Sequence, residues 1–322
     1  MAFLCFVVKS TNKLTIGIFS YERSLILNAI VGVLESFELP FDVLVADDSL
    51  AHNNYLTRLA SNWKGLGTLR YIHNSVNLGH DRNLLSLFEQ CDTPFLWVIG
   101  DSIQPTFDGV VEVLRLLEYD PDALILSSEN RGVNKRCFSE YSELYVDFCW
   151  YVTLSGCLVY SLKNTSRFTV SKHINHFLDT NFLQLGLFFK SLALVDNFVV
   201  YSSDVKCFFT RDGRKGSYWF RNIFDVFCRD WVLVNQRLSD NLTDDMLAKV
   251  LLSHDLNTNL FLSKSFFYIL GKGFLKRADY LSHKEVISMS VLHPRFIFFL
   301  INIRYLFIPF AILVDLYLKF RR

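Results

Sequence analysis

The sequence predicts an α/β protein, with a mostly parallel, doubly wound sheet flanked by helices and a helical region at the C-terminus. Two patterns carry this prediction. Over residues 13–128, short apolar segments alternate with longer segments of helical spacing, which is typical of parallel sheets. After residue 219, apolar residues recur three and four positions apart, as in helices that bury one face. The 322 residues, 51% of them hydrophobic, are enough to form a full core.

The order of these elements indicates where ligands bind. The expected strands cover residues 13–20, 41–48, 69–74, 95–101, 123–128 and 198–203. The expected helices cover residues 24–37, 53–63, 81–91, 107–119 and 179–194. Ligands of open α/β sheets bind at the carboxyl ends of the strands. The candidates for chemistry are therefore the strand-end residues Ser20, Tyr21, Asp47, Asp48 and Asp101.

Bulk charge and cysteine content exclude some classes of protein. The 33 basic and 32 acidic residues give a net charge of +1, so no overall field favours nucleic acid as a partner. The seven cysteines are odd in number and scattered, which favours reduced, mostly buried thiols. Residues 1–10 have a short apolar run without a basic region or a cleavage site. We expect a strand or an arm there, in a cytoplasmic protein.

A change of pattern predicts two parts, residues 1–215 and 216–322. The second part begins with apolar residues at helical spacing. Thr243 is expected to cap a helix whose first turn carries Asp244 and Asp245. The apolar residues at helical spacing are Phe220, Ile223, Phe224, Phe227, Trp231 and Val234.

The C-terminal stretch is the most hydrophobic in the chain. Residues 296–318 are long enough to span a bilayer, but Arg304 and Asp315 are costly there and Pro309 would kink the helix. An amphipathic helix lying on a membrane surface suits this mixture better. A buried core helix, a homodimer helix and a true span are the alternatives. The basic residues that favour the membrane surface are Lys319, Arg321 and Arg322.

Two further groups of polar residues follow the second and third strands. An acid at the end of a buried strand, such as Asp47 or Asp48, can accept hydrogen bonds from ribose hydroxyls. A turn that caps the next helix is the alternative. Arg82 enters a helix whose N-terminal end favours anions, and arginine can bind a phosphate with two hydrogen bonds. A surface arginine beside a turn is an equally good interpretation.

Four motifs together resemble a known family. "TIGIFSYER", "VLVADDSL", "YIHNSVNLGHDRNLL" and "WVIGDSIQP" occur in the order and spacing of glycosyltransferase family 2, which has the GT-A fold. The motif "NSVNLGHDRN" is most similar to bacterial O-antigen enzymes of the abequosyltransferase type. The resemblance is clear over residues 13–115, weaker to about residue 235 and absent beyond.

The resemblance implies roles for the strand-end residues. Tyr21 and Asp48, with Ser20 and Asp47 beside them, would contact the base and ribose of a nucleotide-sugar. Arg82 and Asn83 would lie near the nucleotide. Asp101 occupies the position of the acids that hold Mn or Mg against the donor diphosphate. Ser102 and Ile103 follow where relatives often carry further acids, so we expect weak metal binding without donor, or activity without metal.

The family also implies a carboxylate that takes the proton from the acceptor hydroxyl. Asp179 is the expected base, at a predicted helix start, although Thr180 follows it where relatives carry a second acid. A plain helix cap is the alternative. Weaker candidates for the base are Asp147, Asp204 and Asp212.

Residues 210–219 resemble a loop that closes over the diphosphate. Arg211, Arg214 and Lys215 would clamp phosphate oxygens, unless the loop is simply a solvated basic segment. The pair His173 and His176 lacks a third metal ligand at a recognisable spacing.

The resemblance implies an enzyme, a hexosyl- or deoxyhexosyltransferase that moves a sugar from a nucleotide-diphosphate donor to a saccharide, with inversion. We expect a lipid-linked acceptor of O-antigen or surface polysaccharide synthesis, at the inner face of the bacterial inner membrane. The alternative is an inactive scaffold subunit of a polysaccharide assembly complex.

Overall fold

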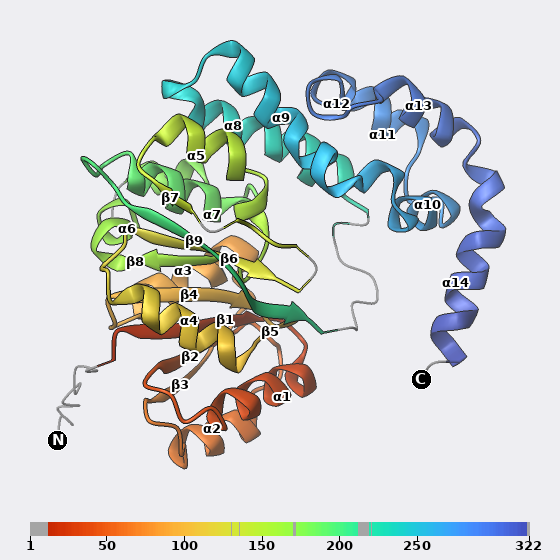
Figure 1. Cartoon of the computed structure of the whole chain (residues 1–322). Coiled ribbons are helices and arrows are strands. Elements are labelled where there is room, and N and C mark those ends of the chain that lie inside the picture. The colour runs from red at the N-terminus through yellow and green to blue at the C-terminus, as the bar shows by residue number, and fades with distance from the viewer. Residues whose placement is uncertain are drawn as a thin grey trace. The chain divides into compact units, whose positions relative to one another are not determined.

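The computed structural model describes residues 12–129, 131–134, 136–169, 172–211, 219 and 221–320 (Figure 1). The expected N-terminal strand or arm and the boundary predicted at residue 215 lie outside these residues. The chain divides into two compact units. The first comprises Met1–Tyr141, Val152–Asp179 and Leu183–Gly213, and the second comprises Ser142–Tyr151, Thr180–Phe182 and Arg214–Arg322.

The first unit is built on one sheet with the strand order β3-β2-β1-β4-β8-β6-β9-β5, and β7 pairs with β9. The strands are β1 (Leu14–Ser20), β2 (Asp42–Asp47), β3 (Leu69–His73), β4 (Phe95–Gly100), β5 (Ile103–Pro105), β6 (Ala123–Ser128), β7 (Arg136–Phe138), β8 (Leu158–Ser161) and β9 (Val200–Thr210). Strands β1 to β4 are parallel, as predicted. The other half is mixed: β6 and β9 are parallel, whereas β8 runs against both of its neighbours and β5 and β7 run against β9.

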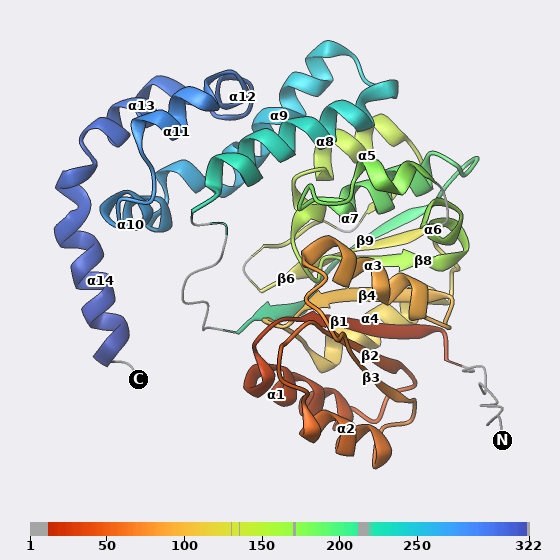
Figure 2. The same cartoon turned by 180° about the vertical axis from the view of Figure 1, so that it is seen from behind.

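Helices cover both faces of this sheet, so β2, β4 and β6 are buried along their whole length. These elements are α1 (Ser24–Glu35), α2 (Asn54–Ser61), α3 (His80–Gln90), α4 (Phe107–Leu117), α6 (Leu162–Thr169), α7 (Leu183–Leu185), the 3-10 helix η2 (Lys172–His176) and the π-helix η3 (Gly186–Lys190). Figures 1 and 2 show α4 on one face of the sheet and α3 on the other.

Two glycines allow the helices to approach the sheet closely. A Cβ on Gly17 of β1 would lie 2.8 Å from Leu96 Cδ1 and 3.2 Å from Leu87 Cδ1 of α3. A Cβ on Gly109 of α4 would lie 2.3 Å from the carbonyl oxygen of Cys207 in β9. A larger residue at position 109 would force α4 away from β9, whereas at position 17 the leucine side chains would have to shift.

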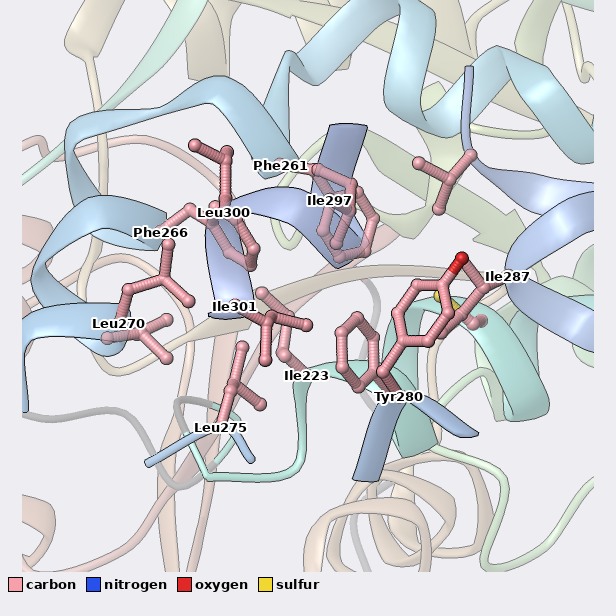
Figure 3. Close-up of a cluster of buried hydrophobic side chains, with 14 residues drawn as sticks. Ile223, Phe261, Phe266, Leu270, Leu275, Tyr280, Ile287, Ile297, Leu300 and Ile301 are labelled. Carbon is pink, nitrogen blue, oxygen red and sulfur yellow. The ribbon is translucent and has the colours of Figure 1, made fainter. Parts of the chain in front are cut away.

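The second unit is helical, as the sequence predicts for the C-terminal region. Its elements are α5 (Tyr141–Phe148), the π-helix η5 (Asp225–Asp230), α8 (Trp231–Leu238), η6 (Ser239–Asn241), α9 (Asp244–Thr258), η7 (Leu260–Leu262), α10 (Lys264–Gly271), α11 (Arg277–Ser282), α12 (Lys284–Ser290), α13 (Pro294–Asn302), η8 (Arg304–Phe307) and α14 (Ile308–Phe320). Thr243 caps α9, because its side chain accepts a hydrogen bond from the Met246 amide. Ile223 and Phe224 belong to a buried cluster with aromatic and aliphatic residues of α10 to α13 (Figure 3).

The hydrophobic C-terminus is not one helix. Helices α13 and α14 are bent by 75° around a break at Ile303. Pro309 lies in the first turn of α14, where its missing N–H costs nothing, so the kink expected within the helix is replaced by a break before it. Within the described residues no single helix is long and apolar enough to cross a membrane, whereas this bent pair passes on length and composition.

Candidate functional site

The parallel register of β1, β2 and β4 brings the predicted strand-end residues to one edge of the sheet. Ser20 pairs with Asp47, and Phe19 pairs with Gly100. Asp48 and Asp101 each follow the last residue of their strand. Residues far apart in the sequence thus meet at the edge where open α/β sheets bind ligands.

Asp101 is a buried carboxylate that anchors the segment after β1. Its Oδ2 accepts hydrogen bonds from Ser20 Oγ at 3.3 Å and from the Tyr21 amide at 3.5 Å. Its Oδ1 forms an ion pair with Arg23 Nη1 at 3.3 Å. Both side chains of the pair are largely shielded from solvent, with 10% of Asp101 and 19% of Arg23 exposed. The acid that the sequence assigns to a metal is therefore already bound by a protein cation.

Asp47 and Asp48 are adjacent but have different environments. Asp47 is fully buried, where it accepts hydrogen bonds from the Ser49 amide at 3.0 Å and from Tyr71 OH at 3.0 Å. Burial, together with the charge of Asp47, raises the pKa of Tyr71 to about 12, so the phenol stays protonated and keeps donating. Asp47 thus fixes the end of β2 and has little capacity left for a ligand.

Asp48 faces the turn that precedes α3. Its Oδ1 accepts from Asn74 Nδ2 at 2.6 Å, and its Oδ2 accepts from the Leu78 amide at 3.0 Å. Burial raises the pKa of this carboxyl above its usual 3.8, although both hydrogen bonds act in the opposite direction. A carboxylate that is held in place but incompletely compensated is suited to accept hydroxyl donors from a ligand.

The two neighbours at the start of α3 point to different places. Asn83 is buried, and its Nδ2 donates to the carbonyl oxygens of Ser20 at 3.2 Å and Ala46 at 3.4 Å, tying the ends of β1 and β2 together. Arg82 is half-exposed, and its Nη2 forms an ion pair with Asp179 Oδ2 at 3.3 Å. The structure thereby joins two predicted site residues that are 97 positions apart.

The predicted helix start at Asp179 is wrong. Asp179 lies in a turn with a φ of 61°, and Asn181 has a φ of 63°, so the chain reverses before α7 begins at Leu183. Two left-handed residues cannot belong to a right-handed helix. Since α7 starts four residues later, Asp179 is not its cap either, and its side chain remains mostly exposed beside Arg82.

Within the basic loop, residues 210–219, the structure describes Thr210, Arg211 and Trp219. The Arg211 amide donates to the carbonyl oxygen of Ser102 at 2.8 Å, which places this residue beside the Asp101 turn. Its Nε is buried without a hydrogen-bond partner among the described residues. Arg214, Lys215 and Asp212 lie outside the described residues.

The donor set at Asp101 does not fit a resident divalent metal. Mn and Mg prefer several oxygen ligands, whereas both oxygens of Asp101 are used by protein donors and Ile103 is a buried strand residue. No cluster of three or more His, Cys, Asp or Glu side chains able to hold a metal occurs in the described part of the chain. The rings of His173 and His176 contact each other edge to face, with centroids 5.9 Å apart.

A small, mostly apolar cavity lies beside the strand ends. It has a volume of about 40 Å³ and is lined by Phe19, His80, Val98, Gly156 and Gln184, among others. This space holds a water molecule but not a sugar ring. A sugar bound at this edge must therefore occupy the open side of the strand ends.

The sequence reasoning missed the residues that position the acids. Arg23, Asn74 and Tyr71 each bind one of the three strand-end carboxylates. All three lie within the motifs that resemble the family, and for Asn74 and Arg23 the polar residue type shortly after a strand is a signal in the sequence. For Tyr71, inside β3, alternation along the strand gives no such signal.

This fold is the GT-A fold expected from the sequence, and solved structures share it. Residues 1–349 of TarS from S. aureus superpose with a TM-score of 0.54 and 14% identity, covering 91% of this chain and 87% of that one. The same TarS fragment in complex with UDP-GlcNAc gives a TM-score of 0.54 with 12% identity, covering 90% and 91%. The mannosyltransferase PcManGT from Pyrobaculum calidifontis, in complex with GDP-Man and Mn²⁺, gives 0.50 with 10% identity, covering 93% and 86%. No family model and no curated protein matches the sequence.

Proposed function

We propose that this protein is a glycosyltransferase that moves a sugar from a nucleotide-diphosphate donor to a saccharide hydroxyl. The observation that carries the proposal is the cluster of Ser20, Asp48, Asn83 and Asp101 at the carboxyl ends of β1, β2 and β4. The fold is shared with TarS in complex with UDP-GlcNAc and with the mannosyltransferase PcManGT in complex with GDP-Man. Family 2 membership and a hexosyl or deoxyhexosyl donor are part of this proposal, on the strength of the four motifs.

The donor site is assembled from the strand-end residues. Asp48 accepts hydrogen bonds from the ribose hydroxyls, because its carboxylate is fixed by Asn74 and the Leu78 amide. The ring of Tyr21, which is 48% exposed, is available to stack on the base. The end of β1, next to Tyr21, is fixed by two hydrogen bonds. Ser20 Oγ donates to Asp101, and Asn83 Nδ2 donates to the Ser20 carbonyl oxygen.

The proposed reaction is a direct displacement with inversion. Asp179 takes the proton from the acceptor hydroxyl, whose oxygen then attacks the anomeric carbon. The bond from that carbon to the donor phosphate breaks, and its electron pair leaves with the nucleoside diphosphate. Asp179 suits the role of base because its side chain is 73% exposed and is oriented by Arg82. The expected Mn or Mg has support in the Mn²⁺ complex of PcManGT, but the contacts of Asp101 give it no step here.

The acceptor that we propose is a lipid-linked saccharide of O-antigen or surface polysaccharide synthesis, met at the inner face of the bacterial inner membrane. The support is the apolar surface of the second unit. Helix α14 packs against α10 through Ala311, whereas Leu306, Ile312, Leu313 and Tyr317 are exposed. Residues 294–322 carry five basic residues and one acid, which favours an anionic lipid surface.

The test is binding and turnover of nucleotide-sugars by the full chain. UDP-, CDP-, GDP- and dTDP-sugars are screened by thermal shift, because a ligand that binds only the native state raises the melting temperature. We expect one nucleotide class to stabilise the protein, and the Asp48→Ala variant to lose this shift. A protein that binds and hydrolyses none of these donors would contradict the proposal and favour the scaffold alternative.

A further inference from the structure

We propose that Arg23, held in place by Asp101, supplies the positive charge that the donor diphosphate requires, in the position where a divalent metal would otherwise act. Asp101 is then a positioning residue for a cation that belongs to the chain. The inference rests on the proposed nucleotide-sugar site and deepens it. It explains why the single acid at this strand end is bound by a guanidinium rather than surrounded by further acids.

The segment that carries Arg23 is fixed from two sides. On one side, Asp101 accepts from Ser20 Oγ and the Tyr21 amide. On the other, the Glu22 amide donates to Ser49 Oγ at 2.7 Å, and the Glu22 side chain accepts from the Leu50 amide at 2.7 Å. Glu22 has a φ of 56°, a conformation that needs such support. The guanidinium is thereby presented at a defined position.

Two features at this point can attract an anionic ligand. The Arg23 guanidinium shares its charge with Asp101, and the N-terminal amides of α1, which begins at Ser24, add positive potential next to it. A divalent ion bound to Asp101 would have to displace or repel this guanidinium. A diphosphate would instead be attracted, and a guanidinium can bind two of its oxygens at once.

The role in the reaction follows from the charge that develops on the leaving group. As the bond between sugar and phosphate breaks, negative charge grows on the departing diphosphate. A preorganised cation at that oxygen stabilises the charge without the arrival of a metal. The Arg211 amide binds the carbonyl oxygen of Ser102, the residue after Asp101. Arg211 can therefore supply a second guanidinium to the diphosphate.

The decisive experiment compares nucleoside diphosphates with the matching nucleosides by calorimetry on the full chain, in EDTA and in Mn²⁺. The wild type should bind the diphosphate equally well in both. Arg23→Ala should weaken diphosphate binding in EDTA about tenfold or more, with nucleoside binding unchanged. Because Asp101 is then released, Mn²⁺ should restore diphosphate binding in this variant. Arg58→Ala, at an exposed arginine of α2, is the matched control and should behave as wild type.

Arg23→Lys guards against a variant that fails to fold, since it keeps the charge and should bind in EDTA with intermediate affinity. Compared with the same mixture of Mn²⁺ and diphosphate without protein, free Mn²⁺ measured by electron paramagnetic resonance should fall further with Arg23→Ala but not with wild type. Diphosphate binding by the wild type that requires Mn²⁺ would overturn the inference and leave the proposed function intact. No nucleotide binding under either condition would instead refute the proposed function.

Discussion

Arg82 Nη2 lies 3.3 Å from Asp179 Oδ2, so the start of α3 and the turn before α7 meet in an exposed ion pair. Such a pair adds about 0–1 kcal/mol to stability, because water screens both charges. The main effect of the pair is on position. Arg82 holds the Asp179 carboxylate next to the start of α3 and leaves most of the Asp179 side chain accessible.

Asp179→Asn should lower turnover by about 10²–10⁴-fold and leave donor affinity unchanged, because the amide cannot take the acceptor proton. The measurement is steady-state kinetics with a donor identified by the thermal-shift screen. Asp204→Asn, at an exposed acid of β9 and another candidate for the base, is the matched control. Loss of turnover in that control with full activity in Asp179→Asn would reverse the assignment.

Donor affinity should rise with pH across the titration of Asp48. The folded pKa is raised above 3.8, so between these two values the folded state binds more protons than the unfolded state. The stability contributed by Asp48 is therefore largest at low pH and declines as pH rises through the folded pKa. Over the same window the carboxylate forms and can accept ribose hydroxyls. Nucleoside affinity measured from pH 4 upward should therefore rise while the stability contributed by Asp48 falls. An affinity that does not change with pH would argue against the role.

Asp101→Ala should destabilise the protein by about 3 kcal/mol, because it leaves the shielded Arg23 without its carboxylate. Asp92→Ala serves as the control, since Asp92 pairs with Arg70 at a more exposed position. That change should cost about 0–1 kcal/mol. Urea denaturation measures both, and equal costs would show that the Asp101 pair is an ordinary surface contact.

The membrane proposal predicts that the full chain floats with anionic lipid vesicles and less with zwitterionic ones, an effect that salt weakens. Leu313→Asp, at a side chain 64% exposed on α14, should abolish flotation. Leu25→Asp, at an 85% exposed position of α1, should not. A wild type that stays off vesicles, but forms a dimer that Leu313→Asp dissociates, would establish the homodimer alternative instead.

Two helix glycines provide a test of the packing. Gly109→Ala should destabilise by about 1–3 kcal/mol, because the new Cβ would meet the backbone of Cys207. Gly32→Ala in α1 should be stabilising by about 0.5–1 kcal/mol, since no described atom lies within 4 Å of the added Cβ. Thermal unfolding distinguishes the two, and similar effects would mean that α4 can shift away from β9.

Local pattern predicted much of the fold. The strand Ala123–Ser128 and the cap Thr243 have the predicted positions, because apolar runs and capping residues act over a few residues. Strand direction is decided by distant pairing, so the antiparallel strand β8 had no local signal. The same limit applies to the site: the acids at the strand ends were predictable, whereas Arg23 binds a partner 78 positions away.

The side chain of Asp315 has a consequence for how deeply the C-terminus can enter lipid. Its carboxylate accepts from Tyr268 OH at 2.9 Å and pairs with Lys272 Nζ at 2.9 Å, on the side of α14 that faces α10. Moving α14 alone into hydrocarbon would strip this acid of both partners, and moving it with them would bury Lys272 as well. We therefore expect α10 and α14 to approach a bilayer as a joined pair. Helix α14 would lie at the depth of the lipid headgroups, and α10 would lie on its side away from the lipid.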